Sequence, residues 1–294
     1  MKASLGEKTF NVVNVFILAL ITFATLYPFW YVLVISLNNN AVASYLDVYF
    51  WPKAFTLANY KVIFSTSLLV SGYKITILRT VIGTVISVIG NAAMAYVLVK
   101  KQLMGRKVLI SLVLITLYFS GGIIPLYILL RNLHLINTFP VLIIPYLFNA
   151  WYIILMKTYF SQLPESLDES ARIDGANDIV IFFRIIMPIS MPIISTISLF
   201  CAVGYWNDWF AGDMYLSDQN LFPIQTILMK ILNEMKGDEI LRRSSSGVVD
   251  SNHMPSLEAV KNASIIVTII PIILVYPFLQ KYFIKGIMIG SIKG

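Results

Sequence analysis

Charged residues are scarce in this 294-residue chain: Asp, Glu, Lys and Arg together make up 13% of it, against about 25% in ordinary globular proteins. With 58% apolar residues and a mean hydropathy of +0.78, this composition excludes a cytosolic enzyme and a disordered chain and indicates a membrane protein. Cysteine is nearly absent too. Cys201 stands alone, which excludes a disulfide scaffold, and packing is its expected role within an apolar run.

The sequence also lacks the motifs of nucleotide and metal chemistry. No Gly-x-x-x-x-Gly-Lys-Ser/Thr loop occurs, so any energy from ATP must come through another chain. The two histidines, His134 and His253, lie far apart and form no cluster with metal-ligand spacing. We therefore expect no catalytic residue, no metal and no cofactor in this chain.

Six apolar runs are long enough to cross a bilayer, which takes about 20 residues in a helix. They cover roughly residues 11–37, 75–99, 108–130, 139–160, 189–211 and 263–284. The first follows Lys2 and Lys8 as a signal peptide would, but it is longer than the apolar core of about 7–15 residues found in such peptides. The pattern predicts an all-α membrane protein with six transmembrane helices.

The orientation of these spans follows from the short loops, because positive charge is retained in the cytoplasm. Residues 100–107 carry four positive charges and residues 131–137 carry one. The first loop is therefore predicted to be cytoplasmic and the second external, which places both termini in the cytoplasm. The net charge of +7 fits this rule better than nucleic-acid binding, because the sequence has no basic cluster longer than the few residues around Lys100 and Lys101.

The external loop at 212–262 contains apolar residues at helical spacing between Pro223 and Met235. This spacing predicts an amphipathic helix packed on the outer face.

Several predicted spans contain helix breakers that a simple anchor would not need. They are Gly121, Gly122 and Pro125 in the third span, Pro145 in the fourth, and Pro271 and Pro277 in the sixth. Such residues kink helices and free backbone carbonyls. The kinks either improve packing between helices or lie beside a water-filled cavity. A carboxylate at membrane depth costs roughly 3 kcal/mol or more. Asp208 should therefore face a cavity or a partner, unless it reaches solvent at the interface.

The loop at 161–188, between the fourth and fifth spans, predicts two short helices joined by a glycine. Asp168 and Arg172 are placed for an ion pair one turn apart. Gly175 can take the left-handed conformation that ends the first helix, and Asn177 can cap the second. The result would be a rigid knob facing the cytoplasm.

This loop resembles the cytoplasmic signature loop of ABC importer permeases, a Glu-Ala-Ala motif with a glycine four residues after its last alanine and a terminal Leu-Pro. Here it reads Glu169-Ser170-Ala171, then Asp174-Gly175-Ala176, and ends at Met187-Pro188. Ser170 and Met187 depart from the family pattern but leave its spacing unchanged. An ordinary amphipathic connector is one alternative. A helix-turn-helix DNA reader is another, although Arg172 and Arg184 offer little attraction for phosphate.

Further segments are similar to the carbohydrate-uptake class, and within it to the maltose-type second permease subunit, over nearly the whole chain. They are Trp51-Pro52 with residues 55–60, residues 206–209, and residues 276–283 with Gly286 and Gly290. The chain is also similar to the group associated with oligosaccharides from complex polysaccharides, including pectin-type chains. A permease for another solute, such as a sugar phosphate, and a non-transporting membrane receptor are the rival interpretations.

The resemblance implies a type I ABC importer permease fold in the bacterial cytoplasmic membrane, working by alternating access. It implies a heterodimer with a second permease subunit, two ATPase subunits that hold ATP and Mg, an extracytoplasmic solute-binding protein and a carbohydrate substrate.

Three groups of site residues are expected. Residues of the loop would couple to the ATPase: Glu169, Ser170, Ala171, Asp174, Gly175, Ala176 and Pro188. Ala171 would have to be small to enter a cleft of that subunit. The C-terminal tail would also contact the ATPase interface, through Gln280, Lys281, Gly286 and Gly290. Sugar hydroxyls and ring faces would meet polar and aromatic side chains in the membrane, namely Asn91, Asn149, Tyr152, Trp206, Asn207 and Asp208. Hydrogen bonding between helices is the alternative role for these polar groups.

Overall fold

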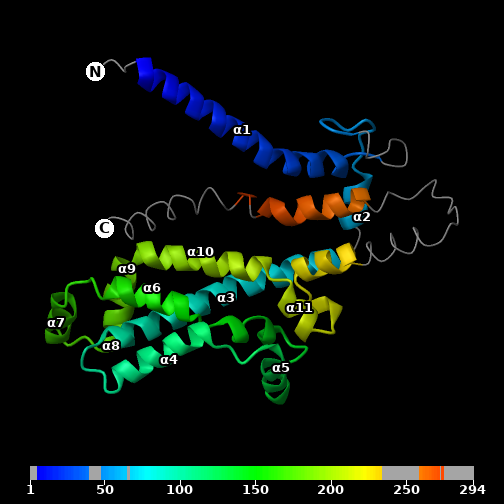
Figure 1. Cartoon of the computed structure of the whole chain (residues 1–294). Coiled ribbons are helices and arrows are strands. Elements are labelled where there is room, and N and C mark those ends of the chain that lie inside the picture. The colour runs from blue at the N-terminus through cyan, green and yellow to red at the C-terminus, as the bar shows by residue number, and fades with distance from the viewer. Residues whose placement is uncertain (1–4, 40–47, 65–66, 234–257, 272, 275–294) are drawn as a thin grey trace. The chain divides into compact units, whose positions relative to one another are not determined.

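A computed structural model describes residues 5–39, 48–64, 67–233, 258–271 and 273–274 (Figure 1). Within them all regular structure is helical, apart from one isolated β-bridge between Asn38 and Phe55. The all-α prediction is therefore confirmed. The predicted tail contacts at Gln280, Lys281, Gly286 and Gly290 lie outside the described residues. The described residues form two compact units: those within 5–67, 228–233 and 258–271 belong to the first, and those within 68–227 and 273–274 to the second.

The first unit contains α1 (Leu5–Ser36), α2 (Ala58–Phe64) and a helix at residues 258–271. α1 is long and apolar enough to cross a membrane, and none of its most apolar window is buried within the chain. Within the described residues only its C-terminal end is buried, at Val34, Ile35 and Ser36. The end of α1 is tied to the segment that follows it, because Trp30 Nε1 donates to the Phe50 carbonyl (2.9 Å) and Asn59 Nδ2 to the Ser36 carbonyl (2.8 Å).

The second unit is built around α3, the other helix that is long enough to span a membrane by itself. Its long helices are α3 (Ser67–Val99), α4 (Arg106–Tyr118), α5 (Ile123–Asn132), α6 (Ala150–Phe160) and α10 (Met191–Asn207). α6 packs against both α4 and α10. Gly83 lets α3 approach α10 closely, since a β-carbon there would lie 2.8 Å from the Tyr205 ring. The shared apolar core contains residues of α3, α6, α7 and α10.

Two predicted spans are broken rather than continuous, and a third begins at a bend. In the third, α4 and α5 meet at 115°. In the fourth, the 3-10 helices η2 (Phe139–Leu142) and η3 (Ile144–Tyr146) meet α6 at 52°. At the start of the fifth, the helical segment Asp178–Ile189, which belongs mostly to the preceding loop, meets α10 at 87°.

The causes of these breaks differ from one span to another. Gly122 lies at the first break with φ +85°, as its missing β-carbon allows. Pro125 instead lies in the first turn of α5, where proline fits without breaking a helix. Pro145 lies in η3, at the second break.

The described residues therefore hold two continuous spans, or up to five if each bent pair is one span. The sixth predicted span is described only at 263–271 and 273–274, so the count of six and the position of the termini stay predictions. The predicted amphipathic helix is present at 224–233, and both Ile224 and Ile227 are buried.

Candidate functional site

The loop at 161–188 folds as its sequence indicates. It contains α7 (Ser166–Ile173), α8 (Asp178–Ile181), a π-helical turn η4 (Phe182–Ile186) and α9 (Met187–Ile189). Gly175 follows α7 with φ +82°, the left-handed conformation that ends a helix. Asn177 caps α8 by accepting a hydrogen bond from the Val180 backbone N–H (2.9 Å). Both local predictions are confirmed.

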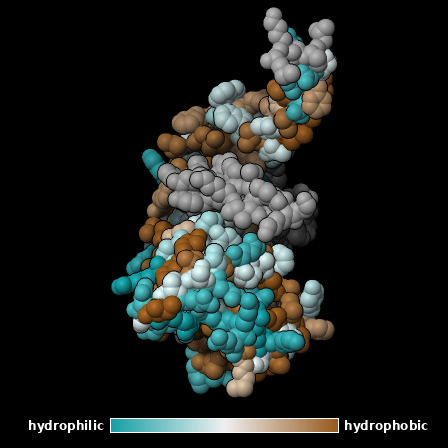
Figure 2. All heavy atoms as spheres, turned by 90° about the vertical axis from the view of Figure 1, so that its left-hand side faces the viewer, coloured by the Kyte–Doolittle hydropathy of each residue, from teal (hydrophilic) through white to brown (hydrophobic). Residues whose placement is uncertain are grey.

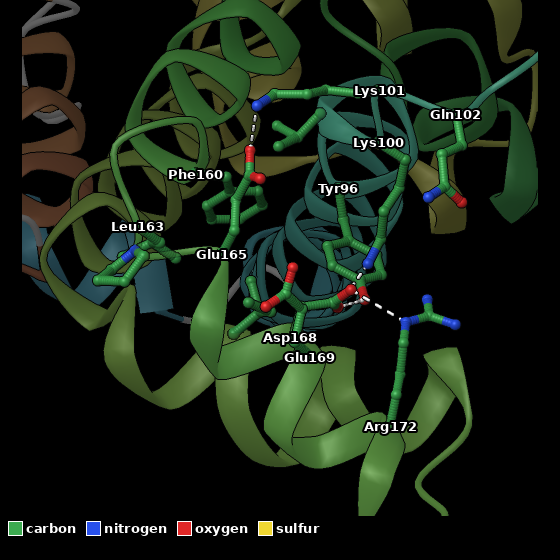
Figure 3. A pocket seen from close by; sticks show the side chains of 13 residues that line it. Tyr96, Lys100, Lys101, Gln102, Phe160, Leu163, Glu165, Asp168, Glu169 and Arg172 are labelled. Carbon is green, nitrogen blue, oxygen red and sulfur yellow. Dashed lines mark hydrogen bonds and ion pairs between the residues drawn. The ribbon is translucent and has the colours of Figure 1, made fainter.

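Asp168 attaches α7 to the end of α3 (Figure 3). Its Oδ1 accepts a hydrogen bond from the Tyr96 hydroxyl (3.0 Å) and pairs with Lys100 Nζ, while Oδ2 accepts from Arg172 Nε (3.0 Å). Arg172 also pairs with Asp178 at the start of α8. Partial burial acts to raise the pKa of Asp168, but the hydrogen bonds from Lys100, Arg172 and Tyr96 outweigh it and hold this pKa below its usual value. The carboxylate therefore stays charged throughout the neutral pH range.

A cavity of about 310 Å³ lies beside this network, between the end of α3 and α7. Its charged and polar lining comes from the α3–α4 connection and from α7: Lys100, Lys101, Gln102, Glu165, Asp168, Glu169 and Arg172. Lys101 and Glu165 form a second ion pair across it (Figure 3). The positively charged loop at 100–107 and the loop at 161–188 therefore lie at the same end of the second unit.

Most of the predicted coupling residues are exposed at this end. Figure 2 views the chain from the side on which α7 and α8 lie in Figure 1, and the lower part of the picture shows many hydrophilic side chains with separate apolar patches. Five of the predicted residues are exposed and Ala176 is half-buried; the exposed ones are Glu169, Ser170, Asp174, Gly175 and Pro188. Two apolar side chains that the sequence analysis did not single out are more prominent, since Ile173 is 86% and Ile179 69% exposed.

Ala171 differs from its expected role. Its exposed fraction is 7%, and it belongs to the core cluster that also contains Tyr96, Phe160 and Phe182. Packing inside this chain therefore requires a small side chain at this position. The expected reason was different, namely entry into a cleft of the ATPase subunit.

The polar residues predicted for a substrate path form two groups rather than one. Asn91 is fully buried, and its Nδ2 donates to the carbonyls of Ser87 (2.6 Å) and Leu147 (2.8 Å). Its Oδ1 accepts from the Asn149 backbone N–H (2.9 Å). The Asn149 side chain in turn caps α6, accepting from the N–H groups of Trp151 and Tyr152. These contacts match the alternative role, hydrogen bonding between helices.

The second group surrounds Asp208 and includes Arg79 of α3. Arg79 lies 12 residues from Asn91 in this helix, which corresponds to about 18 Å along its axis. The fully buried guanidinium of Arg79 pairs with the Asp208 carboxylate and also donates to the carbonyls of Asp208 (3.0 Å) and Leu142 (2.9 Å). It lies 5.5 Å from the centre of the Tyr205 ring. Asp208 thus faces a partner, one of the outcomes that its sequence position predicted.

Arg79 itself was missed by the sequence analysis. A single cation within the second apolar run was the signal that could have found it, because intramembrane charges are rarely without a partner or a function. Arg79 and Asn91 both bind carbonyls freed by the break in the fourth span, at Leu142 and Leu147. These carbonyls therefore have hydrogen-bond donors from α3, as backbone groups in a lipid-embedded bundle require.

The other predicted path residues differ in their surroundings. Asn207 is exposed at the end of α10. Trp206 Nε1 is buried and has no hydrogen-bond partner among the described residues. The Tyr152 ring stacks on Phe200 at 6.3 Å between centroids. In the described part of the chain no group of three or more His, Cys, Asp or Glu side chains could hold a metal ion.

The chain resembles known transport proteins over most of its length. Residues 77–289 match the family described as binding-protein-dependent transport system inner membrane component. The chain belongs to this family. The prediction that the chain is an importer permease is therefore confirmed, and the protein is a transport subunit of the inner membrane.

Relatives support this assignment across the whole chain. The permease is 38% identical to Protein LplC of Bacillus subtilis, over 98% of this chain and 96% of the relative. It is 43% identical to the polygalacturonan/rhamnogalacturonan transport system permease protein YtcP of the same organism, over 83% and 84%. A solved bacterial ABC transporter that imports the acidic polysaccharide alginate contains a chain that superposes with a TM-score of 0.84 at 31% identity. That match covers 96% of this permease and 99% of the solved chain.

Proposed function

We propose that this permease is one half of the membrane pathway of an ATP-driven oligosaccharide importer that works by alternating access. The other half is a second permease subunit. Two ATPase subunits, which hold ATP and Mg, bind on the cytoplasmic side, and a solute-binding protein delivers the sugar from outside. The observation that carries this proposal is the folded loop at 161–188, which presents an exposed face at one end of a helix bundle whose family is known.

In this proposal the exposed face of α7 and α8 docks into an ATPase subunit. Ile173 and Ile179 supply the apolar contact, and Glu169, Ser170 and Asp174 surround it with polar groups. Gly175 sets the angle between the two helices through its left-handed backbone. Movement of the ATPase subunits would then be passed to the spans that adjoin this loop, α6 and α10.

The proposed substrate is an oligosaccharide of the kind released from complex polysaccharides. Two observations support this class: the 43% identical relative is a polygalacturonan/rhamnogalacturonan permease, and the superposed chain belongs to a transporter involved in alginate import. Within this chain we propose that Asn207 and Trp206 meet the sugar, because Asn207 is exposed and Trp206 Nε1 has no hydrogen-bond partner among the described residues. Tyr152 is proposed to join them through the part of its ring that the stack on Phe200 leaves open.

The test of the proposed function is transport by a reconstituted complex. The permease should co-purify with an ATPase whose activity rises when the binding protein and labelled oligogalacturonides are added outside, and vesicles lacking this chain should show only background uptake. A membrane receptor would bring down no such ATPase. Stimulation by a sugar phosphate, with none by oligogalacturonides, would replace the substrate class and keep the permease role.

Gly175→Ala should weaken retention of the ATPase subunits during purification. A β-carbon at φ +82° is strained by about 1–2 kcal/mol, and about 1.4 kcal/mol changes a docking equilibrium tenfold. Gly105→Ala is the matched control, because Gly105 also has a positive φ (+73°) and open space around its missing β-carbon, but lies in the α3–α4 connection. Gly175→Asn should be milder, since asparagine tolerates this conformation. Equal retention in the Gly105 and Gly175 variants would show that the angle between α7 and α8 does not matter for docking.

A further inference from the structure

Two neighbouring ion pairs join the α3–α4 connection to α7, and they differ in burial. Lys101 and Glu165 form the outer pair, with side chains 74% and 67% exposed. Lys100 and Asp168 form the inner pair, in which each side chain is 26% exposed. Exposed pairs contribute little because water screens them and the side chains lose conformational entropy. The inner pair is the one that can fix the position of α7.

Asp168 is held from two directions at once. Tyr96 and Lys100 reach it from the end of α3, and Arg172 reaches it from the next turn of α7 (Figure 3). The Lys100 ammonium lies 4.3 Å from the centre of the Tyr96 ring, which adds a cation–π contact. Charge-assisted hydrogen bonds of this kind are about twice as strong as neutral ones.

The same network continues into α8. Arg172 pairs with Asp178 at the first position of α8, and Lys100 Nζ lies 3.7 Å from the same carboxylate. The Tyr96 ring also packs 5.6 Å from Phe182, the first residue of the π-helical turn. Both helices of the proposed docking loop are therefore bound to one end of α3, although no covalent connection joins them to it directly.

α3 is suited to carry motion away from this point. It is an unbroken helix of 33 residues, about 50 Å long, whereas the spans that adjoin the docking loop in sequence are bent beside it or within the membrane. Its other half holds Arg79, which binds the end of α10 through Asp208. A displacement of α7 that is passed to Lys100 would therefore reach the opposite end of the unit along a single rigid element.

We infer that Asp168 and Lys100 are positioning residues that connect the docking loop to α3, so that movement of the loop is transmitted through α3 as well as through its own chain connections. This inference rests on the proposed importer function. It assigns to the inner ion pair a role in coupling that the exposed pair beside it does not share.

The first measurement is of the permease itself and needs no partner. Spin labels are attached at Gln102→Cys and Ser166→Cys, both exposed positions, in a Cys201→Ser background. The distance distribution between them should broaden in Asp168→Asn and in Lys100→Met. It should stay narrow in Glu165→Gln and Lys101→Met, which remove the same charges from the same two elements.

The second measurement is made on the assembled importer in vesicles, with labelled oligogalacturonides as the probe. Asp168→Asn and Lys100→Met should retain the ATPase subunits but hydrolyse about tenfold more ATP for each oligosaccharide imported, the change expected from losing one charge-assisted hydrogen bond. The double variant should lose less coupling than the sum of the two single losses, because both substitutions break the same contact. Lys100→Arg, which keeps the cation, should restore most of the coupling.

The possible outcomes separate this inference from the proposed function. Failure of the unsubstituted permease to retain any ATPase would overturn the proposed function together with the coupling role. Retained ATPase with an unchanged ratio of ATP to oligosaccharide in Asp168→Asn would overturn the inference alone, even if the spin-label distances broaden. Equal loss of coupling in the inner and outer pairs would also overturn it, because charge at this end, rather than the specific contact, would then be the cause.

Discussion

Asp208→Asn is expected to lower the free energy of unfolding of the permease by about 3–5 kcal/mol, the cost of leaving a buried charge without its partner. The Arg79 guanidinium has no exposed surface, and Asp208 is the one carboxylate that pairs with it among the described residues. Asparagine keeps the oxygen that accepts hydrogen bonds from the backbone N–H groups of Phe210 and Ala211, so the first turn of α11 (Phe210–Tyr215) keeps these bonds. The substitution therefore removes the charge and little else. Thermal unfolding of the purified protein in detergent measures the effect.

Two further variants separate the charge from other causes. Asp218→Asn is the matched control, because Asp218 is exposed and its side chain accepts hydrogen bonds only from Asn220 in the described contacts. It should change stability by no more than about 0.5 kcal/mol. Arg79→Met together with Asp208→Asn should recover most of the loss, since apolar replacement of a whole buried pair is often neutral or stabilising. If Asp208→Asn is as mild as Asp218→Asn, the pair does not hold α3 to α10.

Local features of the docking loop could be predicted because short-range rules decide them. The end of α7 at Gly175, the cap at Asn177 and the ion pair between Asp168 and Arg172 all depend on residues within a few positions of one another. A glycine that must take a positive φ and a side chain that caps the next turn leave a signal in the sequence itself.

Contacts between distant segments left no such signal. Arg79 and Asp208 are separated by 129 positions, and Lys100 and Asp168 by 68. The positive charge of residues 100–107 indicates how the spans are oriented in the membrane. It does not reveal that Lys100 and Lys101 pair with carboxylates of α7 and its N-cap. Asn91 and Asn149 could be recognised as polar groups at membrane depth. Their choice between sugar and backbone depended on where the fourth span breaks, which only the folded chain shows.

The role of Ala171 shows the same limit within one motif. Its small size and its place beside Glu169 are evident in the sequence, and both fit a contact with an ATPase. Which face of α7 points toward the chain depends on Tyr96, Phe160 and Phe182, which belong to three other elements. The exposed apolar contact falls instead on Ile173 and Ile179.

Ala171→Trp is therefore expected to disrupt the docking loop from within. Ala171 is 7% exposed in a core cluster, and overpacking a closed site costs about 1–3 kcal/mol, occasionally more for a large increase in volume. The indole cannot turn to solvent without lifting α7 from α3, which would also break the Asp168 contacts. The variant should insert into the membrane but lose protection from hydrogen exchange across residues 161–188. It should lose its ATPase subunits and its sugar uptake as a consequence.

Ser170→Trp provides the matched comparison, because it adds the same bulk at the neighbouring, exposed position of the motif. It should leave hydrogen exchange in the loop unchanged while weakening ATPase retention by crowding the docking face. The two variants would thus reach a similar loss of uptake by different routes, one with a loosened loop and one with an intact loop. Normal exchange protection in Ala171→Trp would mean that the site can expand without cost, and the small size of Ala171 would then need an explanation outside this chain.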